Sequence, residues 1–413
     1  MTEKITLYPI HAVGRPFLDE EAFDDSLLPA EIVPDVHVEK VAGLLTPGTF
    51  DLWKGHVATE KLRAFANTDY AIVHRFRTTN IGTEGAEQKS MQLVRTLSAL
   101  LRVIRPMRQR FFAIQGTVGP DGKFIPGPFD EPEDYVELPE AHKLFHLRPR
   151  DLKKFQQLAA VFLQAMEGEY FNFRLAVQFH DQGHYAFQRY WKLSWFSWIA
   201  GLESLYTADH AEHRGQIVIK ERIKHLLGAS TPVYETGDIP SFLPQPEQNV
   251  IGVIEPIYQL RNIVIHGKRV PDSFYAKEGR FGLDGQLRRV EELVEALSFL
   301  LRKSIQVVLE NQLLENFKDE DTVRAYFSDL GLTRTKLLRR RDIAQILTQH
   351  DHPMDLAEIF QAMNQRYTRP RQPFDIDHVR SWLDEAVAAG QIALNKDARY
   401  SLPVLTVRES VSP

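Results

Sequence analysis

Arg261, Asn262 and His266 stand close together in a mostly apolar stretch, Tyr258-Gln-Leu-Arg-Asn-Ile-Val-Ile-His-Gly267. A guanidinium can neutralise the charge of a phosphate, and an imidazole can move a proton near neutral pH. If the stretch is helical, Asn262 and His266 are four residues apart and share a face, while Arg261 lies about 100° around the helix. The three side chains can then border one cleft and act on the same phosphoryl group.

A helix that ends at Gly267 would position these residues. Glycine suits the left-handed position after a helix, so His266 would occupy the last turn, where the helix dipole favours imidazolium by roughly 0.3–1 kcal/mol. Arg261 lies on the apolar face and needs a carboxylate, a second subunit or a bound phosphate as partner, because an unpaired buried charge is costly. Pro256 either kinks this helix or marks its first turn. The apolar face is formed by residues expected in the core: Ile254, Ile257, Tyr258 and Ile265.

The Arg-Asn-x-x-x-His-Gly pattern of residues 261–267 resembles the motif of the HEPN superfamily, in the form found in its ApeA-like branch. The resemblance applies to Arg261, Asn262 and His266 and, more loosely, to the helical pattern of residues 149–312. It implies that motifs from two chains meet in a homodimer and form a metal-independent endoribonuclease site that needs no cofactor. It also implies a host-defence setting, such as antiviral defence, or a toxin-like system.

A second interpretation of the motif stays open. Arg261 can pair with an internal carboxylate such as Glu203, and His266 can simply cap a helix. HEPN domains that bind without cutting are also part of what the resemblance implies. The alternative function is therefore a non-catalytic adaptor that binds nucleic acid or protein and dimerises through its helical bundle.

Four further cations are candidate contacts for the phosphates of an RNA substrate. Lys268 and Arg269 directly follow the motif, and Lys220 and Arg222 lie in a helix predicted over Ile217–Leu227. The alternative for Lys220 and Arg222 is a solvated helix face. No metal ligands are included in the predicted site.

Composition limits the classes of function. Fifty basic residues against 55 acidic residues give a net charge of −5, so no global positive field attracts nucleic acid, and any such binding must be local. The chain has no cysteine, which excludes disulfides and thiolate metal sites and fits a reducing cytoplasm. No apolar run approaches the ~20 residues that span a bilayer. We expect a cytoplasmic protein without membrane contact.

His180 and His184 have the four-residue spacing of a zinc-protease ligand pair. The detail does not fit that chemistry, because Asp181 replaces the glutamate base and Gly183 weakens the helix that must hold both rings. We do not expect a metal site there.

Pattern changes along the 413 residues predict a mainly α, multidomain protein. We expect residues 1–148 to form an α+β domain with a role in support or recognition, and residues 149–312 to form the HEPN-like helical bundle. The α+β domain contains strands over Tyr70–Arg77 and Arg110–Val118 and a helix from Gln88 to Met107. The bundle contains the motif helix and helical stretches over residues 147–167, 171–206, 217–227 and 285–310.

Residues 320–405 resemble a winged helix-turn-helix, with three short helices before a hairpin at residues 390–402. The helices are predicted over Asp342–Leu347, Asp355–Arg366 and Ile376–Ala389. The third would be the recognition helix, with Asp377, His378, Arg380 and Ser381 on it.

The charge of this region leaves its partner open. Arginines make it locally basic: Arg339, Arg340, Arg341, Arg366, Arg369 and Arg371. Acids on or near the presumed recognition helix offset them: Asp375, Asp377, Asp384 and Glu385. The region can therefore bind DNA or RNA, or serve as a protein-interaction or dimerisation module.

Overall fold

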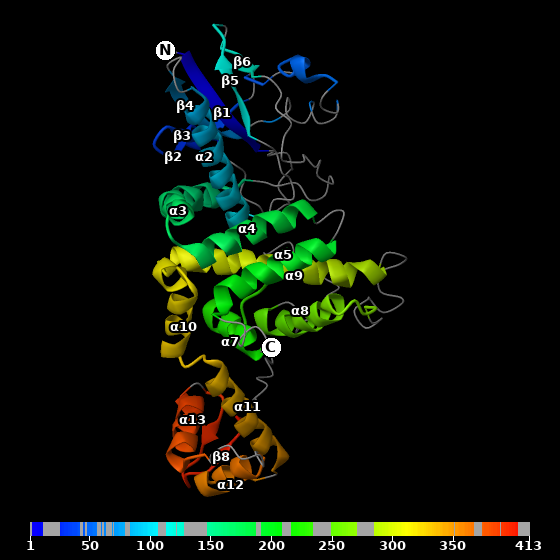
Figure 1. Ribbon diagram of the computed structural model, residues 1–413, viewed down its shortest axis with the longest axis vertical. Helices are drawn as coiled ribbons and strands as arrows, with labels where there is room; N and C mark the ends of the chain where they lie inside the picture. The colour runs from blue at the N-terminus through cyan, green and yellow to red at the C-terminus, as the bar shows by residue number, and fades with distance from the viewer. Residues whose placement is uncertain are drawn as a thin grey trace, which may run out of the picture. The chain divides into compact units, whose positions relative to one another are not determined.

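The computed structural model of the chain is mainly helical, with a six-stranded sheet in its N-terminal region (Figure 1). The structure describes residues 2–10, 25–41, 44–45, 48–55, 59, 62, 68, 70–78, 83–105, 113–120, 122–127, 147–186, 191–208, 216–233, 249–270, 285–350, 352–366, 374–388 and 390–403. The chain divides into two compact units, Met1–Ala208 with Ile223–Val323 and Asp209–Arg222 with Arg324–Pro413. The predicted fold class is confirmed at the coarse level: the protein is multidomain and mainly helical.

The sheet has the order β2-β3-β4-β1-β5-β6, and all its neighbouring strands are antiparallel. Its strands are β1 (Thr2–Ile10), β2 (Ala30–Val33), β3 (Val36–Lys40), β4 (Tyr70–Thr78), β5 (Ile114–Val118) and β6 (Phe124–Pro126). β4 and β5 lie where strands were predicted, whereas β1 was not predicted. Thr6 and Tyr8 on one side of β1 and Leu7 on the other are buried, because β1 is a central strand.

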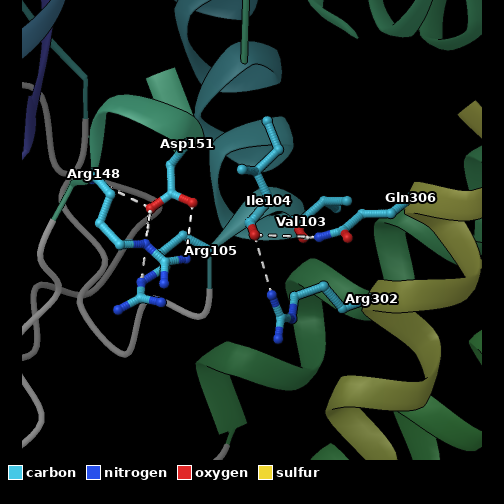
Figure 2. Close-up of polar contacts among 7 residues, drawn as sticks. All are labelled: Val103, Ile104, Arg105, Arg148, Asp151, Arg302 and Gln306. Atoms are coloured by element: carbon cyan, nitrogen blue, oxygen red, sulfur yellow. Dashed lines mark hydrogen bonds and ion pairs between the residues drawn. The ribbon is translucent and has the colours of Figure 1, made fainter. Parts of the chain in front are cut away.

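Helix α2 (Thr83–Ile104) packs against β1 and β4, and its C-terminal end reaches the helices that follow. There its last carbonyls, which have no partner within the helix, accept hydrogen bonds from α9 (Gly285–Glu310). Arg302 Nη1 donates to the Ile104 carbonyl at 3.2 Å, and Gln306 Nε2 donates to the carbonyls of Ile104, at 3.2 Å, and Val103 (Figure 2). Two side chains of α9 thus cap the helix that covers the sheet.

Asp151 forms the second half of this junction, at the start of α3 (Pro149–Glu167). It accepts hydrogen bonds from the guanidinium of Arg148 at 2.8 and 2.9 Å, and the guanidinium of Arg105 approaches it at 4.0 Å (Figure 2). All three side chains are buried. The predicted boundary between residues 148 and 149 therefore falls inside one compact unit, and the predicted division into an α+β domain and a bundle stays a prediction.

The remaining helices of the predicted bundle are α4 (Phe171–Ala186), α5 (Trp191–Tyr206), α7 (Gln216–Leu227) and α8 (Val250–Ile265). The predicted helical stretch of residues 171–206 thus consists of two helices, and α5 packs against α4, α8 and α9. Gly183 of α4 is explained by this packing, because a Cβ there would overlap the indole of Trp198. The division between the two units passes through α7, after Arg222, and through α10 (Glu320–Asp329), after Val323.

The second unit contains α11 (Arg334–Gln349), α12 (Leu356–Arg366), α13 (Ile376–Ala388) and the hairpin β7 (Ala393–Leu394) with β8 (Tyr400–Ser401). Short 3-10 turns occur elsewhere in the chain, at Asp25–Leu27, Asp51–Trp53 and Leu314–Phe317. Three helices and a hairpin appear in the predicted order, although α11 begins at Arg334 rather than Asp342. Met354 also bridges to Tyr400, over a core that includes Ile343, Ile359 and Leu383. The winged-helix assignment stays a prediction.

Candidate functional site

Helix α8 ends in a turn that fixes the backbone of the motif. Gly267 has φ +61° and donates to the carbonyl of Val264 at 3.1 Å, and Lys268 donates to that of Ile263 at 3.0 Å. This pair of bonds is a Schellman motif, which satisfies carbonyls at the end of a helix. The glycine therefore acts as predicted, and His266 is the C-cap residue directly after the last helical residue. At the other end Asn249 caps the helix, so Pro256 lies inside it rather than in its first turn.

Arg261 is held by Glu203 of α5. Its Nη2 donates to Oε1 of Glu203 at 3.0 Å, and the two side chains are 22% and 17% exposed. Its Nη1 reaches Oδ1 of Asn262 at 3.5 Å, a long and weak contact. Its Nε is buried and meets no hydrogen-bond partner among the described residues. The guanidinium thus has one strong partner and retains donor capacity.

Tyr258 is a core residue of α8, one helical turn before Arg261. Burial raises the pKa of its hydroxyl well above the ordinary value, the Glu203 carboxylate and Tyr206 add to that effect, and Arg261 opposes it. The hydroxyl is buried and has no hydrogen-bond partner in the described part of the chain. The sequence indicated Tyr258 only as a core residue, and the one signal of a further role was a hydroxyl where leucine or phenylalanine would serve.

The surface around the motif differs from the prediction at one position. Ile265 was expected in the core but is 43% exposed, because α8 ends there and its last turn leaves the packed face. His266, Lys268 and Arg269 are exposed as well, beside the partly exposed Asn262. The structure therefore brings the motif residues and the two following cations to one helix end.

The expectation that Arg222 contacts a phosphate or lines a solvated face is wrong. Its side chain is 0% exposed, Nε donates to the Leu332 carbonyl at 3.1 Å, and the guanidinium lies 4.4 Å from the ring centroid of Phe327. A guanidinium buried in this way supports its own core instead. Lys220 is half-buried and, like Arg222, belongs to the second unit, so its part in the site stays a prediction.

Of the two histidines of α4, His180 is buried in the core and His184 is half-buried. Nε2 of His180 and Nε2 of His184 are 3.3 Å apart, so the two rings are hydrogen-bonded to each other. Burial, His184 and the cations Arg302 and Arg102 lower the pKa of His180 well below its ordinary value. Within the described residues, no group of three or more His, Cys, Asp or Glu side chains is placed to hold a metal ion.

Much of the basic run of α11 is engaged inside the second unit. Lys336 and Arg340 each donate to Glu385 of α13 at 2.9 Å, and Arg339 pairs with Asp342 at 3.6 Å. Burial alone would raise the pKa of Glu385, but the two cations hold it below the ordinary value. These basic residues therefore offer less charge to a nucleic acid than their number in the sequence suggests.

The outward face of α13 is the more accessible part of that unit. Its exposed residues include those predicted for recognition: Asp377, His378, Arg380 and Ser381. Arg380 pairs with Asp377 at 3.0 Å, and this carboxylate offsets its positive charge. Arg369 and Arg371 lie outside the described residues.

Comparison of the chain with family models, curated proteins and solved structures finds no match. Within the described residues, no helix is long and apolar enough to cross a membrane.

Proposed function

We propose that this protein is a metal-independent endoribonuclease of the HEPN type, whose site lies at the C-terminal end of α8. The observation that carries the proposal is the Arg261–Glu203 pair: a partly exposed guanidinium with spare donors, on the same helix end as the exposed His266. A cation with unused donors on the same helix end as an exposed histidine is suited to an anionic substrate whose reaction moves protons.

The proposed reaction uses the substrate's own 2′-hydroxyl. That oxygen attacks the adjacent phosphorus, the bond from phosphorus to the 5′-oxygen breaks, and the products carry a 2′,3′-cyclic phosphate and a 5′-hydroxyl. His266 moves a proton at the attacking or leaving oxygen, and Arg261 neutralises the charge that gathers on the phosphoryl oxygens. Asn262 orients His266 or the phosphate, while Lys268 and Arg269 hold neighbouring phosphates.

A homodimer belongs to this proposal. The site at one helix end offers one histidine, and two copies related by a two-fold axis would place two motifs face to face, with Ile265 covered between them. Light scattering should then report a dimer. A protein that stays monomeric at tens of micromolar with full activity would exclude the two-chain site but not the chemistry.

A non-catalytic adaptor is the second candidate, favoured by the fact that Arg261 already has a carboxylate partner, Glu203, within one chain. In that case the helical bundle supports dimerisation, and the exposed face of α13 binds nucleic acid or protein.

The deciding experiment is incubation of the purified protein with mixed RNA in EDTA, followed by analysis of the RNA ends. A nuclease of the proposed kind leaves cyclic phosphate ends. His266→Ala should reduce the cleavage rate at least ~10²-fold, the lower bound for loss of a positioned acid or base. His225→Ala, at an exposed histidine of α7, is the matched control and should cleave at the parental rate. If the parent cuts no RNA, or His266→Ala cuts as fast as the parent, the adaptor is the better description.

A further inference from the structure

Tyr258 keeps a buried hydroxyl that the packing of α8 does not need. The side chain is 1% exposed, and no described residue offers its hydroxyl a hydrogen bond. A buried polar group without a partner destabilises a fold, and phenylalanine would fill the same space without that cost. Tyr258 also lies one turn of α8 before Arg261, and residues three apart on a helix are neighbours.

Tyr206 lies one helical turn after Glu203 in α5, and the charge of Glu203 acts on the hydroxyl of Tyr258. The two tyrosines differ in what their protons do. Ser304 donates its hydroxyl proton to the Leu300 carbonyl at 2.6 Å. A serine hydroxyl has one proton, so Tyr206 must be the donor in its 2.8 Å bond to Ser304. The proton of Tyr206 is therefore committed, whereas Tyr258 has a proton that it can donate elsewhere.

We propose that Tyr258 is a positioning residue that donates a hydrogen bond to Glu203 when Arg261 turns its guanidinium toward a substrate phosphate. The inference rests on the proposed function. Glu203 is only 17% exposed, so loss of its guanidinium partner would cost free energy that water cannot fully recover. A hydrogen bond from Tyr258 offsets part of that cost. It frees Nη2 of Arg261, so that two nitrogens of the guanidinium can bind the phosphate.

The electrostatics of the site agree with this role. Burial and the neighbouring Glu203 raise the pKa of the Tyr258 hydroxyl well above its ordinary value. The group therefore keeps its proton throughout the neutral range and remains a donor. Tyr258 does not touch the reacting atoms and acts only through Glu203 and Arg261.

The test compares Tyr258→Phe with the matched variant Tyr206→Phe. Loss of a hydrogen bond to a charged group should raise the KM of Tyr258→Phe for RNA roughly 10- to 100-fold, with kcat changed less, because Arg261 binds phosphate before and during the reaction. The same variant should melt roughly 2–4 °C higher, since it removes an unsatisfied hydroxyl. Tyr206→Phe should melt lower and keep the parental KM. A role in packing alone would not couple weaker binding to higher stability.

A double-mutant cycle with Glu203→Gln shows whether Tyr258 acts through that carboxylate. A neutral amide needs the hydroxyl far less, so in the Glu203→Gln background Tyr258→Phe should raise KM less than about threefold. A parent that cuts RNA while Tyr258→Phe keeps the parental KM overturns this inference and leaves the nuclease in place. An effect of full size in both backgrounds overturns it too. A parent that cuts no RNA overturns the proposed function and the inference together.

Discussion

Two arginine–carboxylate pairs of the larger unit use the same residue types in opposite ways. At the junction between the sheet and the helices, Arg102 of α2 is 3% exposed and its donors are engaged. Its Nε and Nη2 bond Asp181 of α4 at 2.7 Å, and its Nη1 donates to the Tyr8 hydroxyl, also at 2.7 Å. This pair links α2, α4 and β1 and has the saturation expected of a structural contact.

At the end of α8, Arg261 has the same kinds of neighbour without that saturation. Glu203 engages one nitrogen, Asn262 is a distant partner at 3.5 Å, and the hydroxyl of Tyr258 meets no partner in the described residues. The residue types of a charged pair therefore say little about its role. The number of donors left over distinguishes a pair that holds the fold from one that can accept a ligand.

The largest expected effect on stability comes from breaking the Arg102–Asp181 pair. Arg102→Met should lower the free energy of unfolding by about 3–5 kcal/mol, because Asp181 loses its cation and Tyr8 loses its donor. Urea denaturation with a tryptophan fluorescence readout measures the change. Parental stability in this variant would mean that the junction does not depend on Arg102, and the contrast with Arg261 would be lost.

The next effect concerns function rather than stability. Arg261→Lys keeps the positive charge beside Glu203 but removes the planar fork, so RNA cleavage should fall at least ~10²-fold. The free energy of unfolding should change by less than about 1 kcal/mol, since the pair is partly exposed. Cleavage assays and urea denaturation of one preparation give both numbers. Parental cleavage would show that Arg261 makes no two-pronged contact with phosphate.

Gly183 in the core and Gly267 at the end of α8 differ in how closely their surroundings are packed. Gly183→Ala should lower the free energy of unfolding by about 1–3 kcal/mol, because the added methyl group meets the indole of Trp198 in a filled core. Gly267→Ala should cost about 1 kcal/mol, from its positive φ alone, because no described residue beyond its immediate neighbours in the chain lies within 4 Å of the added methyl group. Thermal unfolding of both variants measures the difference. The reverse order would mean that the end of α8 is the more tightly packed of the two sites.

The smallest effect is the pH dependence of stability that His180 of α4 contributes. The pKa of His180 is lowered by burial, by His184 and by nearby arginines, so the unfolded chain takes up a proton near pH 6.5 while the folded chain does not. Stability should therefore be constant above about pH 6.5 and fall below it, by at most about 1.4 kcal/mol per pH unit for one proton. Urea denaturation between pH 7.5 and 5.5 measures the slope. The slope should flatten in His180→Gln, and an unchanged slope would assign it to other groups.

Local sequence determined the positions of most helices and how α8 ends. Residues 285–310 form a helix with the predicted bounds, and Gly267 adopts the left-handed conformation that its place after the motif indicated. Both follow from short-range physics, because helical periodicity and the steric freedom of glycine act within a few residues. The same logic did not predict β1, because proline is disfavoured in central strands, where Pro9 lies, and a strand buried on both faces lacks a regular polar face.

The tertiary structure alone decided which charges meet. The sequence required a partner for Arg261 and left Glu203 as one of several, and it gave no sign that Arg222 would be fully buried or that Tyr258 would keep an unshared proton. Nor did it indicate that Arg302 would cap α2, almost two hundred residues earlier in the chain. A side chain's type fixes how many hydrogen bonds it needs, whereas its partners depend on contacts between distant segments, which no local pattern encodes.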